Sequence, residues 1–134
     1  MMLGVVVIMV ASEPVLRLLI NQLIHFAAFP TRIRMEPQCL DDATHIRCLE
    51  FASTVPHARI RCVRAPCCKA SATTTVLEQI LLYKWVAARL YLLQGLTTIL
   101  VDADALVKTE ACLHEWLAYT EPFVSQIGGA RMSE

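Results

Sequence analysis

The amino-acid sequence predicts an α/β fold: a mostly parallel, Rossmann-like sheet with helices on both faces. Short apolar runs rich in β-branched residues alternate along the chain with segments whose apolar residues recur at helical spacing. Strands that alternate with helices favour a parallel sheet with right-handed crossovers. A chain of 134 residues suits one domain, so we expect a single α/β domain over residues 1–134.

The first strand and the first helix have the strongest patterns of the amino-terminal half. Leu3–Ala11 is continuous and β-branched, which is typical of a strand covered on both faces. Ser12 can cap the helix that follows, Pro14 suits its first turn, and helical spacing continues up to Pro30. Three further elements are predicted: a half-exposed strand over 32–36, a helix over 43–52 capped by the Asp41–Asp42 pair, and a strand over 58–63.

The longest predicted helix runs over residues 75–94, and Gly95 supplies its carboxyl-terminal stop. Leu96–Val101 is then predicted to be a buried strand, which leads directly into the Asp102-Ala-Asp104 motif. The remaining predicted elements are a helix from Thr109 or Glu110 through Tyr119 and a short strand over Pro122–Gln126.

The charge balance and the apolar runs argue against two kinds of partner. Twelve basic and twelve acidic residues cancel, and the basic ones gather between Arg32 and Lys69 without interleaved aromatic residues, so we expect no nucleic-acid binding. The longest early apolar run, Leu3–Ala11, is about half the roughly 20 residues that a membrane crossing needs. No Lys or Arg precedes it and no small-residue cleavage pattern follows, so the sequence predicts no membrane span, anchor or signal peptide.

The cysteines give no clear framework for a metal site or for disulfides. Their spacing matches no zinc pattern, and an apolar content of 56% favours a core that holds without disulfide bonds. A metal site built from Cys62, Cys67, Cys68 and one of the four histidines is a weaker alternative. Trp85 and Trp116 lie on apolar helix faces, which predicts a place in the core.

The acidic pair Asp102 and Asp104 is the strongest candidate for a functional site. Ligands of parallel sheets bind beyond the carboxyl ends of the strands, which is where this pair is expected. Two neighbouring carboxylates repel each other, and a divalent cation such as Mg²⁺ or Mn²⁺ relieves the repulsion while it neutralises a diphosphate. The alternative is structural: Asp102 caps the following turn and Asp104 is solvated.

Two neighbouring segments carry a resemblance to a known family. KWVAARLYLLQG at residues 84–95 and TILVDADALV at residues 98–107 combine a lysine-led helix, a glycine, a strand and a DxD motif. This block resembles the central signature of the nucleotide-diphospho-sugar transferase family. The resemblance extends to the opening strand at Val5–Ala11, to Leu18–Leu23 with its asparagine, and to Phe123–Gln126, so it covers nearly the whole chain.

The resemblance implies a glycosyltransferase of the GT-A fold type, which transfers a hexose or pentose from a nucleotide-diphospho-sugar. Mn²⁺ or Mg²⁺ would be held by the DxD motif, with Asp102 contacting both the nucleotide sugar and the metal and Asp104 binding the metal directly. The chain ends at Glu134, before the acceptor-binding half of such enzymes, so we expect the fold to be incomplete at the C-terminus.

The resemblance also assigns the donor-binding residues outside the acidic pair. Val10, Ala11 and Ser12 are expected near the base and ribose, and Lys84 supports the diphosphate or the DxD turn unless it is a solvated helix lysine. The acceptor, a glycan or a protein, and the group that activates its hydroxyl are not identified. Members of the family imply the Golgi or the secretory pathway as the compartment.

Two alternatives remain open beside a transferase. Where the family usually has an aromatic residue and an Arg-Asp-Pro segment, this chain has Leu106-Val-Lys-Thr-Glu110, which favours a non-catalytic, truncated domain. The run around Asp102 and Asp104 also approaches the motif of haloacid-dehalogenase-like phosphatases, in which Asp102 would be the nucleophile. That motif normally opens its domain, whereas here few residues follow it. No Gly-rich phosphate loop is present.

Overall fold

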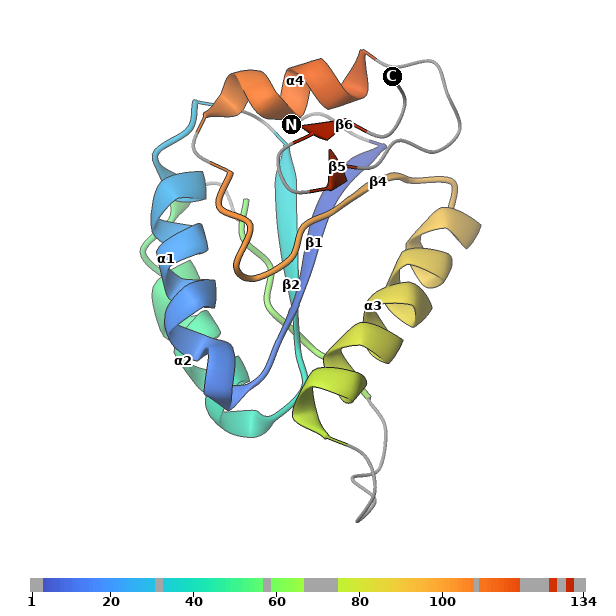
Figure 1. Ribbon diagram of the computed structural model, residues 1–134. Coiled ribbons are helices and arrows are strands. Elements are labelled where there is room, and N and C mark those ends of the chain that lie inside the picture. Colours follow the sequence, from blue (N-terminus) through green and yellow to red (C-terminus); the bar gives the residue numbers. More distant parts are fainter. Residues whose placement is uncertain are drawn as a thin grey trace.

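The computed structural model is a four-stranded parallel sheet with helices on both of its faces (Figure 1). The strands of the sheet are β1 (Val5–Ala11), β2 (Arg34–Cys39), β3 (Val63–Arg64) and β4 (Thr97–Leu100). The helices are α1 (Leu16–Ala27), preceded by a short 3-10 turn over Glu13–Val15, α2 (Asp42–Ala52), α3 (Val76–Leu93) and α4 (Glu110–Leu117). The structure describes residues 4–30, 33–56, 59–66, 75–107 and 109–118, and the backbone alone of 126–127 and 130–131. The predicted α/β fold is confirmed.

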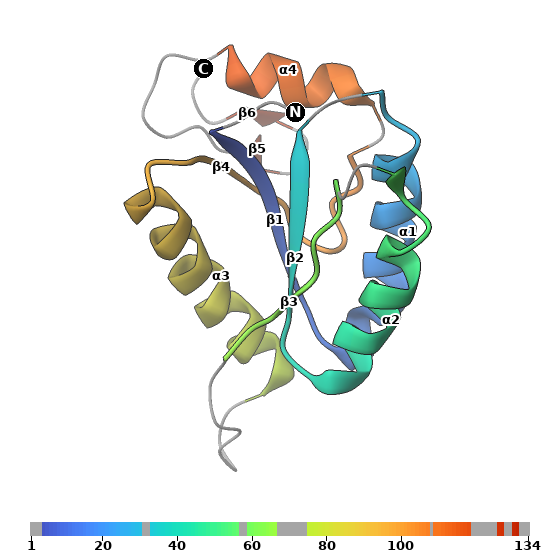
Figure 2. The same ribbon diagram turned by 180° about the vertical axis from the view of Figure 1, so that it is seen from behind.

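The strand order β3-β2-β1-β4 places β1 inside the sheet, between β2 and β4. The chain passes from β1 through α1 to β2 and through α2 to β3, then returns through α3 to β4 on the other side of β1. Figures 1 and 2 show α1 and α2 on one face of the sheet and α3 on the opposite face. The strand order therefore reverses between β1 and β4, and their carboxyl ends form the topological switch point at which ligands of such sheets bind.

β1 is the centre of the hydrophobic core. Val7, Met9 and Ala11 pack into the core on the α1 and α2 side, which also includes Leu113 of α4. The alternate residues Val6, Ile8 and Val10 pack against α3, and all six side chains are buried. Because both faces of β1 are covered, a continuous β-branched run is the pattern that such a strand requires.

β2 and β3 differ from the sequence predictions. The first was expected to be half-exposed over 32–36, but β2 begins at Arg34, runs through Pro37 to Cys39 and is buried from its second residue onward. The second was expected over 58–63, but β3 has two residues, and Ile60 forms an isolated bridge to Met35. The first prediction failed because the alternation of polar and apolar residues suggested an exposed face, whereas the polar side chains of Glu36 and Gln38 are buried together.

Glu36 is the centre of that buried polar group. Its carboxylate lies 2.8 Å from Nε of Arg34 and 3.8 Å from Nη1 of Arg61, and accepts a 2.9 Å hydrogen bond from the Tyr91 hydroxyl of α3. Gln38 donates to the same hydroxyl over 3.0 Å. Burial and the hydrogen bond to Glu36 raise the pKa of Tyr91 to about 12, so the phenol stays protonated and joins α3 to β2.

The structure confirms the predicted Asp41 cap of α2 and the Gly95 stop of α3. The predicted Ser12 cap is wrong, because this side chain forms no capping hydrogen bond. Oδ1 of Asp41 accepts a hydrogen bond from the Thr44 amide over 2.7 Å, which caps α2. Oγ1 of Thr75 accepts from the Glu78 amide over 3.1 Å, which caps α3. Gly95 has a φ of +80°, the left-handed conformation that ends a helix and that glycine adopts without strain.

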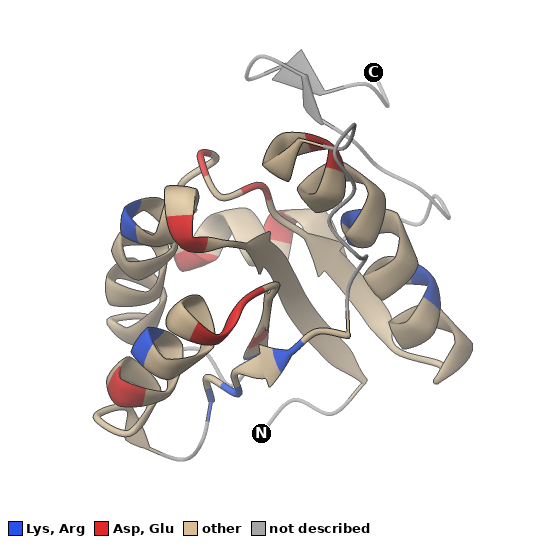
Figure 3. Cartoon of the chain, turned by 90° about the horizontal axis from the view of Figure 1, so that it is seen from below, with Lys and Arg blue, Asp and Glu red and all other residues tan. Residues whose placement is uncertain are grey.

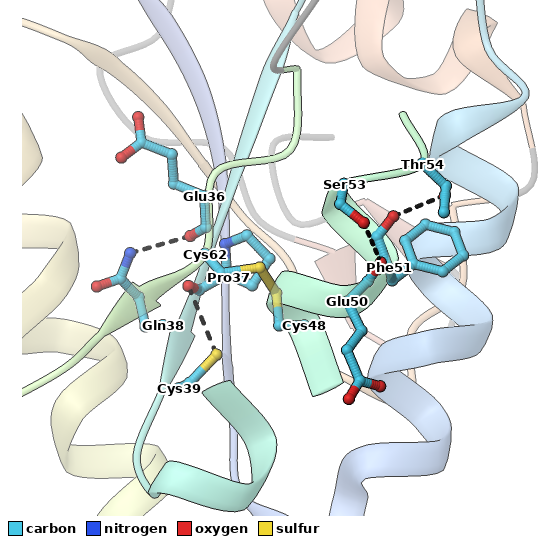
Figure 4. The surroundings of a disulfide bond; sticks show 10 residues. All are labelled: Glu36, Pro37, Gln38, Cys39, Cys48, Glu50, Phe51, Ser53, Thr54 and Cys62. Carbon is cyan, nitrogen blue, oxygen red and sulfur yellow. Dashed lines mark hydrogen bonds between the residues drawn. A yellow bond between two sulfur atoms is a disulfide. The ribbon is translucent and has the colours of Figure 1, made fainter. Parts of the chain in front are cut away.

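A disulfide corrects the expectation that the core holds without such bonds. Cys48 of α2 is bonded to Cys62, which lies just before β3, with Cα atoms 5.9 Å apart (Figure 4). The bond fastens α2 to a segment that forms few strand hydrogen bonds. The sequence could not reveal this pairing, because the two cysteines meet only once α2 has packed on the sheet. Cys39 and Cys112 are free.

The remaining elements agree with the sequence in part. β4 was expected to be fully buried over 96–101, but Thr97 is exposed because β4 pairs with β1 and with no other described strand. Most of the strand predicted over 122–126 lies outside the described residues. Its last residue, Gln126, begins β5 (Gln126–Ile127), which pairs antiparallel with β6 (Ala130–Arg131) in a separate two-stranded sheet. No described helix is both long enough and apolar enough to cross a bilayer.

Removal of the disulfide should destabilise the fold. We expect the Cys48→Ala/Cys62→Ala double variant to lose about 2–4 kcal/mol in free energy of unfolding, because the bond closes a short loop in the unfolded chain. Urea denaturation followed by circular dichroism measures this loss, and a reducing agent should lower the midpoint of the wild type similarly. Cys112→Ala, at a free cysteine, is the control. Equal midpoints for the wild type and the double variant would contradict the expectation.

Candidate functional site

Asp102 and Asp104 follow β4 at the switch point between β1 and β4. Ile8 of β1 pairs with Leu100, and the Val101 amide donates to the Ile8 carbonyl over 3.0 Å. Extending this register sets Asp102 beside Val10, two residues before Ser12. The acidic pair and the end of β1 therefore lie at the carboxyl edge of the sheet, as the sequence predicted. Figure 3 views the molecule from this edge, with acidic residues in red.

The two aspartates belong to a tight turn. The Ala105 amide donates to the Asp102 carbonyl over 3.0 Å, which closes the turn over residues 102–105. Both aspartates are exposed, and the side chain of Asp102 keeps 54% of its surface accessible. The turn therefore presents two carboxylates to solvent within three residues.

Lys84 of α3 contacts the first of the two carboxylates. Its Nζ lies 2.5 Å from Oδ1 of Asp102, and the Lys84 side chain is only 18% exposed. The aliphatic part of the lysine is therefore packed while its charged end reaches the turn. Nζ also lies 5.7 Å from the centroid of the Trp85 ring. Lys84 is thus not a solvated helix lysine, and it joins α3 to the DxD turn.

Gln22 of α1 fixes the other end of the turn. Its side chain is 1% exposed; Nε2 donates to the Ala105 carbonyl over 2.8 Å and Oε1 accepts from the Val107 amide over 2.9 Å. One buried amide thus satisfies two backbone groups of the segment after β4. Sequence reasoning missed this residue. Its signal was a polar side chain within the apolar stripe formed by Leu19, Leu23 and Phe26.

Of the three residues expected near the base and ribose, Val10 and Ala11 end β1 and Ser12 follows it. The side chains of Val10 and Ala11 belong to the two halves of the core, so only their backbone faces the edge of the sheet. Ser12 is 5% exposed, and its hydroxyl has no hydrogen-bond partner among the described residues. An unpaired buried hydroxyl costs about 1–3 kcal/mol, so a polar ligand at this position would stabilise the domain.

Asp41 joins the turns that follow β1 and β2. Its Oδ2 accepts from the Glu13 amide over 2.8 Å, while Oδ1 accepts from the Thr44 amide. Burial alone would raise the pKa of Asp41, but the hydrogen bonds from Thr44 and Glu13 and the charge of Arg64 outweigh it, so the pKa lies below its ordinary 3.8. The carboxylate is therefore charged in the folded state at neutral pH.

The carboxylates at this edge can hold a divalent cation only when a second ligand, such as a diphosphate, also binds it. Among the described residues, no group of three or more His, Cys, Asp or Glu side chains converges as a metal site. Asp102 and Asp104 supply two carboxylates, and one is already paired with Lys84. Mg²⁺ sites commonly use one or two carboxylates and complete their coordination with water and phosphate oxygens. The residues present fit such a shared site rather than a cage made by protein alone.

Comparison of the chain with protein-family models, with curated proteins and with solved structures gave no match. The geometry described above is therefore the basis for a functional proposal.

Replacement of Gln22 should loosen the DxD turn. In Gln22→Leu the Ala105 carbonyl and the Val107 amide lose their partner, which we expect to lower the free energy of unfolding by about 2–4 kcal/mol. Hydrogen exchange at the Val107 amide should accelerate more than exchange in β1. The exposed neighbour Asn21, changed to Ala, is the control. Unchanged exchange at Val107 would show that the clamp does not hold the turn.

Asp41 should make stability depend on pH in acid. A carboxylate with a lowered pKa stabilises the fold above 3.8, and this contribution is lost as the pH falls through the folded-state pKa. We expect Asp41→Ala to cost about 1–2 kcal/mol at neutral pH, and Asp41→Asn, which keeps the cap without its charge, to cost less. Urea unfolding at about pH 7 and about pH 3 measures both. The gap between wild type and Asp41→Asn should narrow at the lower pH; a constant gap would contradict the assignment.

Proposed function

We propose that this domain binds a nucleotide-diphospho-sugar together with Mn²⁺ or Mg²⁺ at the Asp102–Asp104 turn and takes part in sugar transfer to a glycan or protein acceptor. The proposal depends on one arrangement at the switch point of the parallel sheet: a closed turn with two exposed carboxylates. The first carboxylate, Asp102, is paired with Lys84 of α3. The resemblance of residues 84–107 to the nucleotide-diphospho-sugar transferase family supports the same ligand.

The charges at the turn favour a cation bound with a diphosphate. Asp102, Asp104 and Lys84 together carry one net negative charge, which attracts a divalent cation. With the cation bound, the sign becomes positive and suits a diphosphate. A bound cation would supply Lewis-acid stabilisation of the leaving diphosphate. Lys84 holds the Asp102 carboxylate in place, and Gln22 holds the backbone beyond Asp104.

Ser12 supports a ligand that extends from the turn toward β1. Its buried hydroxyl is unpaired among the described residues, and Ser12 directly follows β1, the strand adjacent to β4. The hydroxyls of a ribose or the polar edge of a base could satisfy it.

The disulfide supports the secretory pathway as the compartment. Disulfides persist in oxidising environments and are rare in reducing ones. Cys48 and Cys62 are bonded, which agrees with the compartment that the family resemblance implies.

A thermal-shift experiment tests the proposed ligand. Mn²⁺ with a uridine or guanosine diphosphate sugar should raise the Tm, since a ligand at 100 times its Kd adds about 2.7 kcal/mol, or several degrees. Mn²⁺ alone should have a much smaller effect, because the protein supplies too few ligands. Asp104→Ala should abolish the shift, whereas Glu50→Ala, at an exposed carboxylate on α2, should preserve it.

The outcomes separate the alternatives. No shift with any nucleotide sugar would favour a non-catalytic domain. Hydrolysis of p-nitrophenyl phosphate that Asp102→Asn abolishes, and that needs no nucleotide, would assign the domain to the haloacid-dehalogenase-like phosphatases. The motif of those enzymes opens the domain, whereas here the acidic pair follows β4, the last strand of the parallel sheet along the chain. The geometry therefore favours the nucleotide sugar.

A further inference from the structure

The outward side of α3 is largely apolar. Figures 1 and 2 show α3 alone on its face of the sheet, with one side turned away from the strands. Nine large apolar side chains of this helix are between 41% and 72% exposed: Val76, Leu77, Leu81, Leu82, Trp85, Val86, Leu90, Leu92 and Leu93. At 3.6 residues per turn, six of the nine lie on the side of the helix away from Tyr83, Ala87 and Ala88. We call these six residues the outer face of α3: Leu81, Leu82, Trp85, Val86, Leu92 and Leu93. Helices α1 and α2 each expose two large apolar side chains.

The exposed apolar side chains of α3 indicate that another molecule packs against this helix. Its inner side is already packed through Tyr83, Ala87 and Ala88, so α3 is apolar on both sides. A helix that is apolar all round is normally buried. The expectation that Trp85 belongs to the core is accordingly wrong for the isolated chain, where this side chain is 56% exposed. Exposed apolar patches of this extent mark interaction sites.

Two charges divide the outer face symmetrically. Glu78, Leu82, Trp85 and Arg89 follow one another at steps of four, three and four residues, the spacing of a single stripe in helix pairs. Glu78 lies near the start of α3 and Arg89 near its end. Neither forms an ion pair with another described residue. Both pairs, Glu78 with Arg89 and Leu82 with Trp85, are centred between Tyr83 and Lys84.

We propose that a second copy of this chain covers the outer face, with the two α3 helices antiparallel about a two-fold axis near residues 83 and 84. This axis sets Glu78 opposite Arg89 of the partner subunit and Leu82 opposite Trp85 of the partner subunit. Each contact occurs twice, as a two-fold interface requires. Parallel packing would instead set like charges against each other.

The available area suits this occupant. A stable interface takes about 800 Å² from each partner, and the six apolar side chains of the outer face together with Glu78 and Arg89 offer an area of that order. A membrane surface is the competing occupant. Helices that lie on membranes carry several Lys or Arg residues around the apolar face. The exposed charges of α3 are one acidic and one basic residue, because Lys84 is largely buried and paired with Asp102.

Sedimentation velocity on the full chain tests the proposal, independently of the proposed ligand. Over about 1–100 µM the 15.0 kDa chain should sediment as a dimer. Leu82→Glu should raise the dimer dissociation constant at least about 100-fold, because it buries two charges at the centre of the interface. Leu49→Glu, at an exposed apolar position of α2, should leave the dimer intact, and circular dichroism should show that both variants are folded.

A charge exchange tests the antiparallel arrangement. Arg89→Glu should weaken the dimer at least about tenfold, since it places like charges opposite each other at two positions. The Glu78→Arg/Arg89→Glu double variant should restore the affinity to within about threefold of the wild type. A monomer at all concentrations, a dimer that resists Leu82→Glu, or a double variant without rescue would each overturn the proposal. Binding of the monomer to phosphatidylcholine–phosphatidylserine vesicles would assign the face to a membrane.

Discussion

The burial of β1 on both faces is the constraint on which the rest of the structure depends. Val7, Met9 and Ala11 anchor one half of the core, and the alternate residues Val6, Ile8 and Val10 anchor the other. Because β1 pairs in parallel with both β2 and β4, its direction fixes where those strands end. The same packing that stabilises the fold therefore brings Ser12 and the acidic turn to one edge.

Polar side chains from three helices then stabilise that edge. Gln22 of α1 binds the backbone of residues 105–107, Lys84 of α3 pairs with Asp102, and Asp41 at the start of α2 binds the turn after β1. Each contact joins a loop to an element that the core already holds. A ligand that binds there meets a preorganised turn, so little ordering entropy is lost on binding.

The sequence correctly predicts the elements that depend only on residues near one another in the chain. The β-branched run of β1, the Gly95 stop of α3 and the Asp41 cap of α2 each depend on residues close in the chain, and the structure confirms them. β2 was mispredicted because Glu36 is compensated by Tyr91, 55 residues away. The Cys48–Cys62 bond and the Gln22 clamp likewise depend on tertiary contacts. Trp85 was wrongly predicted to lie in the core. Apolar residues occur around most of α3, so their spacing does not show which side of the helix faces the sheet. The position of Asp102 and Asp104 at the edge was predictable because it follows from topology alone.

α3 has three roles at once, and this has a mechanical consequence. The helix covers one face of the sheet, carries Lys84 to the acidic turn and exposes Trp85 directly beside that lysine. A displacement of α3 along its axis by even one residue would shift Lys84 by about 1.5 Å, enough to break a contact with Asp102. A partner bound to the outside of α3 would consequently determine whether Lys84 contacts Asp102. In return, a ligand that separates Lys84 from Asp102 would change the affinity for that partner.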